Sequence, residues 1–327
     1  MRLGTLKHPR AKDGEFVVVS HDLQKAVRAS GVAPSLREAV ENWQECRPRL
    51  QKLSDDLNDG KRSDAFLVDE TRFHSPLPRS FQWADGSAFI HHVKLVRMAR
   101  KAPLPETLMT VPLMYQGGSD DFLGPCDSIP QIDFSHGTDF EGEVAVVTEF
   151  VPMGISASEA LNKICLIMIA NDVSLRGLIP AELAQGFGFF QSKPSTAFAP
   201  FAVTPDELGE AWKDGRVHLP LEVSYNGEFF GKADAGEMHF HFGELIAHAA
   251  RTRNLTAGTI IGSGTVSNEQ EDRGSSCLAE KRMLEQIKTG EAQTPFMKVG
   301  DRVRIEMKDS FGQSLFGAID QSVVSWK

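Results

Sequence analysis

The sequence predicts an α+β protein whose larger part is mainly β. Short β-branched and aromatic runs recur along the chain, whereas only a few segments carry apolar residues at helical spacing. The 28 glycines and 17 prolines supply turn residues between these short elements. Many strands with scattered helices and glycine-rich turns indicate a mainly-β or α+β core.

Residues 1–72 are predicted to form a small α+β domain. Residues 16–19 are a short β-branched strand, and residues 36–57 have helical spacing with many charged side chains. The segment 74–78 contains two prolines two positions apart, which favours extended chain. We therefore expect a link there and a larger domain over residues 73–327.

The larger domain is predicted to combine strands with a few helices. Asn226-Gly227 separates two β-prone runs and predicts a type I′ hairpin. Residues 298–307 and 322–325 are predicted strands near the end of the chain. Ser156-Ala157-Ser158-Glu159 is a capping box that begins a helix, and residues 242–252 have the pattern of another.

Composition limits the possible partners. The chain is 41% hydrophobic and 24% charged, which is typical of globular proteins, and its net charge of −9 argues against binding of nucleic acid. The longest apolar run is too short for a membrane span, and the first residues lack the apolar segment of a signal peptide. The four cysteines are far apart and form no C-x-x-C pair, which is typical of reduced thiols. We therefore expect a cytoplasmic protein with no membrane partner.

The segment from Asp139 to Val147 places three carboxylates two residues apart and then continues into a β-branched run. On a strand, Asp139, Glu141 and Glu143 would project from one face and Val144 from the other. Like charges on one face repel, and a divalent cation that binds several oxygens would resolve that conflict. Without a metal, the same residues would form the solvated face of an amphipathic strand.

Two further segments offer oxygen ligands. The apolar run 164–170, a buried strand or helix, ends at Asn171-Asp172, which would present a carboxylate at its end. Asn and Asp also stop apolar elements without any further role. Upstream, Asp85 precedes apolar residues at helical spacing, and this stretch includes His92. Asp85 would alternatively cap that helix.

Two rival motifs carry less weight. His239 and His241 would share one strand face, as in some zinc sites, but no cysteine or third histidine is near them in sequence. The loop 262–265 lacks the G-K-[ST] ending of a nucleotide-binding loop, and its amides and hydroxyls suit a substrate carboxylate.

In combination, these motifs resemble the fumarylacetoacetate hydrolase family. The resemblance covers residues 75–327 and rests on five motifs, which are Asp85 with His92 seven residues later, Glu141-Gly142-Glu143, Asn171-Asp172-Val173-Ser174-Leu175-Arg176, Gln191-Ser192-Lys193-Pro194 and Gly262-Ser263-Gly264-Thr265-Val266-Ser267. The E-x-E strand together with N-D-x-S-x-R is specific to that family. The resemblance implies a rolled, mixed β-sheet fold with a metal in a cleft, and a homodimer.

The resemblance also implies roles for single residues. It assigns a divalent metal, Mg²⁺ first and Ca²⁺ or Mn²⁺ otherwise, to four carboxylates, which are Asp85, Glu141, Glu143 and Asp172. The catalytic histidine falls on His92, held by a glutamate that falls on Glu280. Lys193 is catalytic and contacts substrate, and the other substrate contacts are Tyr115, Thr265 and one basic residue among Arg97, Arg100 and Lys101, for which we choose Arg100.

The implied function is metal-dependent hydrolysis of a carbon–carbon bond in a β-diketo acid, fumarylacetoacetate or a related acylpyruvate, as in the catabolism of tyrosine and other aromatic compounds. The metal would hold the charge of the departing enolate, and His92 would act as general base to water. Lys193 and Thr265 would hold the oxyanion and the substrate carboxylate.

The sequence departs from the family pattern after Arg176. The family's aspartate is Gly177 here, and its glutamine is replaced within Leu178-Ile179-Pro180. These departures leave the exact substrate open. The alternatives are a 2-oxo acid hydratase, isomerase or decarboxylase of the same superfamily, or a catalytically silent protein that binds a metal or a 2-oxo acid.

Overall fold

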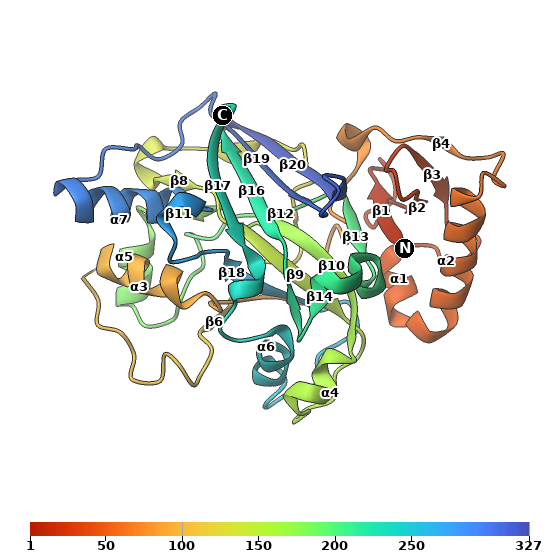
Figure 1. Cartoon of the computed structure of the whole chain (residues 1–327), viewed down its shortest axis with the longest axis horizontal. Coiled ribbons are helices and arrows are strands. Elements are labelled where there is room, and N and C mark those ends of the chain that lie inside the picture. Colours follow the sequence, from red (N-terminus) through yellow and green to blue (C-terminus); the bar gives the residue numbers. More distant parts are fainter. Residues whose placement is uncertain (100, 327) are drawn as a thin grey trace.

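The computed structural model describes residues 1–99 and 101–326, and it confirms the predicted α+β class (Figure 1). The main sheet is mixed and contains eleven strands, which are β1 Arg2–Leu6, β2 Glu15–Val19, β3 Lys25–Arg28, β4 Phe66–Leu67, β5 Trp83–Gly86, β6 Met114–Gly117, β9 Gly142–Thr148, β10 Ile164–Asn171, β12 Ala197–Phe198, β13 Phe201–Val203 and β18 Ile260–Thr265. Their order is β4-β3-β2-β1-β13-β10-β9-β18-β5-β6, with β12 paired to the end of β10. Only β18 and β5 pair in parallel among these strands.

The second sheet contains five strands in the order β17-β16-β19-β20-β7. Their bounds are β7 Ile129–Gln131, β16 Pro220–Tyr225, β17 Glu228–Asp234, β19 Arg302–Lys308 and β20 Ser314–Ser325. Two short ribbons complete the strands, and they are β8 Thr138–Asp139 with β11 Ser174–Leu175, and β14 Trp212–Lys213 with β15 Arg216–Val217.

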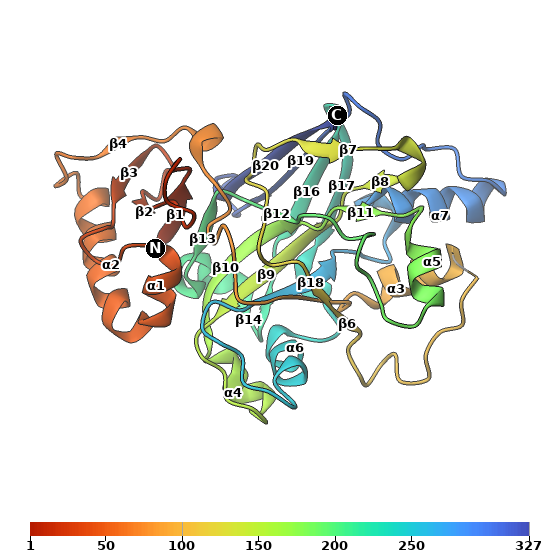
Figure 2. The ribbon, with the colours of Figure 1, turned by 180° about the vertical axis from the view of Figure 1, so that it is seen from behind.

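Seven α-helices lie within the described residues, and their bounds are α1 Leu36–Glu41, α2 Trp43–Asn58, α3 Ile90–Ala99, α4 Ala157–Leu161, α5 Ile179–Ala184, α6 Phe242–Ala249 and α7 Leu278–Thr289. Short 3₁₀ turns occur at Glu70–Arg72, Phe134–His136, Pro205–Ala211, Ala235–Glu237 and Glu271–Arg273. Helices α3, α5 and α7 gather at one end of the molecule, opposite the N-terminal strands (Figures 1 and 2). None of the described helices has the length and apolar character needed to cross a membrane.

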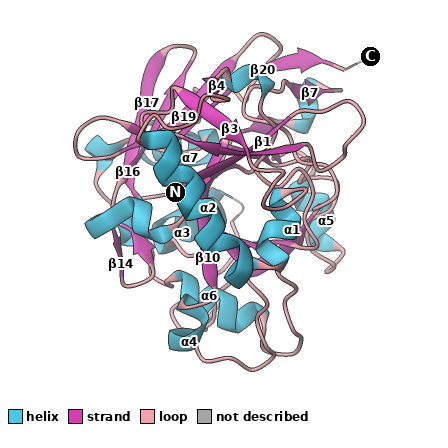
Figure 3. Ribbon diagram, turned by 90° about the vertical axis from the view of Figure 1, so that its right-hand side faces the viewer, coloured by secondary structure: helices cyan, strands magenta, loops and turns pink. Residues whose placement is uncertain are grey.

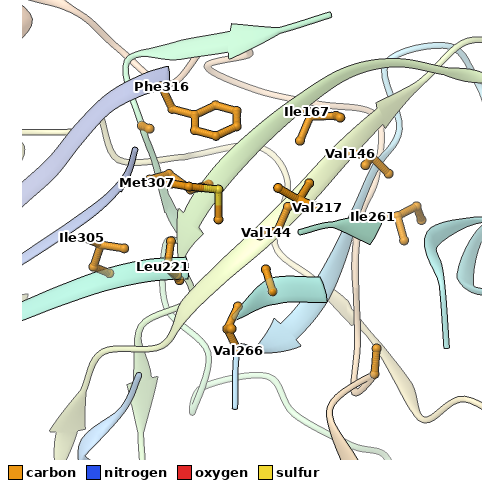
Figure 4. Close-up of a cluster of buried hydrophobic side chains, with 14 of the residues drawn as sticks. Val144, Val146, Ile167, Val217, Leu221, Ile261, Val266, Ile305, Met307 and Phe316 are labelled. Carbon is orange, nitrogen blue, oxygen red and sulfur yellow. The ribbon is translucent and has the colours of Figure 1, made fainter. Parts of the chain in front are cut away.

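The core lies between the two sheets. Apolar side chains of β9, β10 and β18 pack against those of β16, β19 and β20, and Figure 4 labels ten members of this cluster, which are Val144, Val146, Ile167, Val217, Leu221, Ile261, Val266, Ile305, Met307 and Phe316. β-Branched residues suit this environment because their side chains pack well on a pleated surface. This rigid core fixes the ends of β5, β9 and β10 relative to one another.

The N-terminal strands continue the main sheet. β1 pairs with β13, and residues of α1 and α2 share a buried cluster with residues of β9 and β10. Figure 3 views the molecule from this end, where α1 and α2 flank the strands. The main sheet therefore includes strands from both predicted domains. The boundary expected between residues 72 and 73 stays a prediction.

Several local predictions are confirmed. Asn226 and Gly227 both have positive φ, as a type I′ hairpin requires, and they join β16 to β17. The capping box at Ser156 begins α4 with both of its hydrogen bonds. The helix predicted over residues 36–57 is instead two helices, because Asn42 adopts a non-helical conformation (φ −119°, ψ 39°) between α1 and α2.

Candidate active site and metal centre

Three buried carboxylates from β5, β9 and the end of β10 meet in the main sheet, in which β18 lies between β5 and β9. Asp85 lies in β5, Glu143 in β9, and Asp172 directly follows β10. Ligand atoms from the three residues lie within 4.8 Å of one another. The apolar run that precedes Asp172 is strand β10, which pairs with β9 so that Ala170 lies opposite Glu143. Strand pairing therefore brings together residues that are up to 87 positions apart in the sequence.

These three acids are unequally paired within the described residues: Asp172 contacts a lysine and two hydroxyls, Asp85 accepts one backbone hydrogen bond, and Glu143 accepts none. Among the described residues, neither oxygen of Glu143 has a hydrogen-bond partner, although the residue is completely buried. Burial, together with the charges of Asp85 and Asp172, raises the pKa of Glu143 well above its usual range. Burial and Asp172 likewise raise the pKa of Asp85, whose Oδ1 accepts a hydrogen bond from the Gly264 N–H at 2.9 Å. Unpaired carboxylate oxygens at this spacing suit a hard divalent cation.

Glu141 lies beside this cluster but has different partners. Its carboxylate accepts hydrogen bonds from the Arg176 guanidinium at 2.6 Å and the Lys193 ammonium at 2.5 Å. Burial favours a raised pKa of Glu141, but Arg176 and Lys193 outweigh burial and hold it well below the usual range. Glu141 lines the same cavity as Asp85 and Glu143. Its role as a fourth metal ligand stays a prediction.

Asp139 lies outside the acid cluster. The regular alternation expected over residues 139–147 is interrupted, because β8 ends at Asp139 and β9 begins at Gly142. The Asp139 carboxylate accepts hydrogen bonds from Arg176 at 2.9 Å and from the N–H groups of Leu278 and Ala279 at 2.7 and 2.9 Å. These two amides belong to the first turn of α7, where unpaired N–H groups favour an anion. Asp139 therefore anchors the start of α7.

His92 in α3 forms a pair with Glu280 in α7. The His92 Nδ1 lies 2.7 Å from Glu280 Oε1, and both side chains are buried. Because a carboxylate only accepts hydrogen bonds, Nδ1 carries the proton and Nε2 is free to accept one. Nε2 lies 3.7 Å from Glu141 Oε1, and His92 lines the cavity. Cys277 also lies close to this pair, but burial raises its pKa well above the usual thiol value and keeps it protonated.

Lys193 is a buried lysine that bridges two acids. Its ammonium lies 2.5 Å from both Glu141 Oε2 and Asp172 Oδ2, and its side chain is only 7% exposed. Burial favours a lowered pKa of Lys193, but the charges of Asp172 and Glu141 raise it. Asp172 also accepts hydrogen bonds from the hydroxyls of Tyr115 at 2.6 Å and Thr196 at 2.7 Å. The ammonium therefore stays charged beside the acid cluster.

One cavity of about 290 Å³ is lined by seven of these side chains, which are Asp85, His92, Tyr115, Glu141, Glu143, Arg176 and Lys193. Thr265 contributes a buried hydroxyl with no hydrogen-bond partner among the described residues. The preceding residue must be glycine, because Gly264 has φ +76° and an added Cβ would lie 2.5 Å from the Gly86 carbonyl oxygen. Arg97 lines the cavity and donates a hydrogen bond to the Pro103 carbonyl. Arg100, the predicted substrate contact, lies outside the described residues.

Comparison with known proteins identifies the family of this chain. The family described as fumarylacetoacetate (FAA) hydrolase C-terminal matches residues 82–324, and fumarylacetoacetase N-terminal domain 2 matches residues 1–79. The chain belongs to the fumarylacetoacetate hydrolase family.

Similar family members have different activities. Oxaloacetate tautomerase YisK of Bacillus subtilis (strain 168) is 26% identical over 75% of this chain and 81% of its own length. The 2,4-didehydro-3-deoxy-L-rhamnonate hydrolase of Sphingomonas sp. (strain SKA58) is 28% identical over 50% of this chain and 54% of its own length. Maleylpyruvate hydrolase of Sphingobium sp. SYK-6, solved in complex with manganese (II) ion and pyruvate, has a TM-score of 0.65 at 15% identity, with all of both chains covered. The similarity to maleylpyruvate hydrolase shows a shared fold.

This fumarylacetoacetate hydrolase family protein contains site residues that the sequence analysis did not single out. Arg176 joins Asp139 to Glu141, and its signal was already present as the last residue of the N-D-x-S-x-R motif. Glu182 in α5 accepts hydrogen bonds from the N–H groups of residues 190–192, just before Lys193, and no sequence pattern indicates this contact. His241 caps α6 and His239 bonds the Met109 carbonyl, so these two histidines have structural partners.

Proposed function

We propose that this protein is a metal-dependent enzyme that hydrolyses a carbon–carbon bond of a β-diketo acid of the acylpyruvate type. The main support is one observation: His92, whose Nδ1 is bonded to Glu280, lines the same cavity as Glu143, whose two oxygens have no described hydrogen-bond partner. A base oriented by a carboxylate serves to activate water, and an oxygen-rich cation site serves to hold a 2-oxo acid. A base and a cation site that face the same cavity suit hydrolysis of such an acid.

The residues present fit a divalent cation. Asp85, Glu143 and Asp172 offer oxygens only, and Glu143 has two buried oxygens that no described group satisfies. Oxygen ligands suit Mg²⁺, Mn²⁺ or Ca²⁺, and we propose Mg²⁺ as the first choice. When bound, the cation would act as a Lewis acid toward the oxygens of the 2-oxo acid and stabilise negative charge that develops there.

The proposed reaction uses His92 twice. Nε2 takes a proton from water as the water oxygen attacks the distal acyl carbonyl of the substrate. The bond between that carbon and the methylene carbon then breaks, and its electron pair goes to the methylene carbon as the enolate of pyruvate. The proton on Nε2 returns to this carbon, so the products are one carboxylic acid and one pyruvate. Glu280 and Glu141, on either side of His92, stabilise the imidazolium that exists between the two steps.

Lys193 and Thr265 are the proposed oxyanion and carboxylate contacts. Lys193 keeps its charge inside the cavity, and the Thr265 hydroxyl is buried without a described partner. Donors that are already oriented stabilise developing negative charge without further rearrangement. We further propose that Arg176 holds Glu141 in place through their 2.6 Å hydrogen bond.

A second candidate is keto–enol tautomerisation of oxaloacetate, which the relatedness to the Bacillus subtilis tautomerase favours. That reaction also moves a proton at the carbon next to a 2-oxo group, but it uses no water. The same base and acid cluster would serve it, so only product analysis separates the two candidates.

The test is an assay of acetylpyruvate and of oxaloacetate with and without Mg²⁺. Acylpyruvate hydrolysis predicts acetate and pyruvate in equal amounts, a loss of the enol absorbance, and a fall of about 10²–10⁴-fold in His92→Gln. Faster keto–enol exchange of oxaloacetate with no acetate from acetylpyruvate would replace the hydrolase proposal by the tautomerase.

A further inference from the structure

We infer that the acid bound in the active site carries an apolar acyl chain, and that a groove between α3, α5 and α7 binds this chain. The inference rests on the proposed function and narrows its substrate class. It follows from the side chains that line the groove and from the position of the groove next to the active-site cavity.

The active-site cavity has a polar part and an apolar part. The acids, His92, Lys193 and Thr265 supply the polar surface described above. The remaining walls are mostly apolar and come from several elements, and their side chains are Val93, Val96, Leu113, Met114, Ile179, Leu183 and Phe189. The volume of about 290 Å³ is at the small end of typical ligand sites, which hold about 300–1,000 Å³. A longer substrate therefore needs additional space.

Such space lies directly beside the cavity. A groove of about 630 Å³ shares four lining residues with it, which are Val96, Arg176, Ile179 and Leu183. The walls beyond this junction are mainly alanine, proline, methionine and phenylalanine side chains of α3, α5, α7 and the segment after α7. No carboxylate occurs among the described residues that line the groove. Figures 1 and 2 show α3, α5 and α7 together at this end of the molecule.

The two arginines of the groove already have partners. Arg176 is held by Asp139 and Glu141. The guanidinium of Arg282 lies 4.2 Å from the centre of the Phe296 ring and donates a hydrogen bond to the Thr294 carbonyl. A polar chain end placed here would lose its hydrogen bonds to water and find few protein groups to replace them. An alkyl chain would instead be stabilised by its removal from water.

Ile179 marks the junction between the cavity and the groove. It is almost completely buried and lines both spaces. Its side chain offers only apolar contact to whatever occupies the junction. The junction therefore favours an apolar chain as well.

The first experiment measures kcat/KM for acetyl-, butanoyl-, hexanoyl- and octanoylpyruvate with Mg²⁺. We expect a rise of up to about fourfold for each methylene that enters the groove, since burial of one methylene is worth up to about 0.8 kcal/mol. Hexanoylpyruvate with a terminal carboxylate is the matched polar compound, and it should be the poorer substrate. A flat series, or a preference for the carboxylate-ended chain, would overturn the inference while hydrolysis of acetylpyruvate still supported the proposed function.

A binding series separates the inference from turnover. Straight-chain 2-oxo acids from four to ten carbons have no second carbonyl to hydrolyse. Calorimetry on the Mg²⁺-loaded enzyme therefore measures how binding affinity depends on chain length without turnover. Tighter binding with length supports the inference even if acylpyruvates are not cleaved, which would by itself refute the proposed hydrolase. Affinity that is independent of length would refute the groove as the binding site.

A matched pair of variants on α5 locates the effect. Ala184 lines the groove, and Ala181 is exposed on the same helix but does not line it. In Ala184→Glu the ratio of kcat/KM for octanoylpyruvate to that for acetylpyruvate should fall at least about fivefold, because a charge would face the alkyl chain. Ala181→Glu should keep the wild-type ratio. Gln286→Glu adds the same charge from α7 with little change in size, and it should lower the ratio as well. An unchanged ratio in both groove variants would refute this location.

Discussion

Two groups of buried acids lie near each other in the structure and differ in how far the protein neutralises them. Asp139 and Glu141 are neutralised by Arg176, Lys193 and the amides at the start of α7. Glu143, two residues further on, has no described hydrogen-bond partner and lies against Asp85 and Asp172. All are completely or almost completely buried, so exposure does not explain the difference.

The difference separates a structural role from a ligand-binding role. The first group has oppositely charged partners within the protein, and it connects β8 and the start of β9 to α7. The second group has three acids and one cationic partner, the Lys193 ammonium at Asp172, so negative charge stays in excess. Burial, together with this excess, raises the pKa values of Asp85 and Glu143. Such a group costs stability unless a cation or protons bind it. The comparison predicts that equal substitutions in the two groups will have opposite effects.

The largest effect is expected from Glu143→Gln. Loss of this carboxylate should weaken binding of Mg²⁺ at least about 100-fold and remove metal-dependent turnover, since even the outer contacts of a metal site are worth about 10–100-fold. At a pH where Glu143 is ionised, the metal-free variant should nevertheless melt at a higher temperature than the metal-free wild type, because one uncompensated buried charge is gone.

Glu141→Gln is the matched control, since it makes the same change two residues away. It should lower the melting temperature of the metal-free protein, because Arg176 and Lys193 lose a charged partner. Calorimetry for metal binding and thermal unfolding in EDTA test both variants. Shifts of the same sign in the two metal-free variants would contradict the comparison.

The next largest effect is expected from Arg176→Met, which keeps an apolar side chain of similar length. It leaves Asp139 and Glu141 without a cation that they share, and the free energy of unfolding should fall by about 3–5 kcal/mol. Arg304→Met is the control, because Arg304 also bridges two acids, Glu306 and Asp320, but is 43% exposed, and its loss should cost at most about 1 kcal/mol. Urea unfolding measures both. Equal losses would mean that burial of the Arg176 network does not matter.

A smaller effect is expected from metal and pH together. A carboxyl whose pKa is raised by folding stabilises the protein most below the ordinary pKa of about 4, and that stability is lost as the pH rises through the raised value. Because folding raises the pKa values of Asp85 and Glu143, the melting temperature of the metal-free protein should fall from pH 5 to pH 8. Mg²⁺ at 100 times its Kd should restore about 2.7 kcal/mol, with more effect at the higher pH, where ionised ligands predominate.

Melting curves in EDTA and in Mg²⁺ over that pH range give the measurement. Without metal, the melting temperature of Glu143→Gln should depend less on pH than that of the wild type. A metal-free melting temperature that rises toward pH 8, together with no shift in Mg²⁺, would remove the basis for the second group of acids as a cation site.

The smallest effect is expected from Glu182→Gln. Hydrogen bonds from Ser192 and from the N–H groups of Phe190, Gln191 and Ser192 outweigh burial and hold the pKa of Glu182 at about 2, so the carboxylate fastens the segment before Lys193. The variant should exchange the amide hydrogens of residues 190–192 faster and lose about threefold to tenfold in kcat, because Lys193 is positioned less well. Glu159→Gln, which alters the remote capping box of α4, is the control. Unchanged exchange in Glu182→Gln would show that this contact does not position Lys193.

Much of the local structure could be predicted from the sequence because short-range physics decides it. The Asn226-Gly227 hairpin and the Ser156 capping box each depend on a few neighbouring residues. The break at Asn42 was missed, because apolar spacing continues on both sides of it and only the packing of α1 and α2 shows the change of direction.

The sequence alone determined which residue types were available for the site: the E-x-E pair, the aspartate after an apolar strand, and a histidine on a helix. The pairing of His92 with Glu280 was suggested only through family resemblance, because 188 positions separate the two residues. Tertiary structure decided which acids are neutralised, since the positions of Arg176, Lys193 and the first turn of α7 follow from strand pairing and helix packing. It also decided that Ile179 and Leu183 line both the cavity and the groove. Electrostatic contacts act over a few ångströms in space, and separation along the chain does not specify that distance.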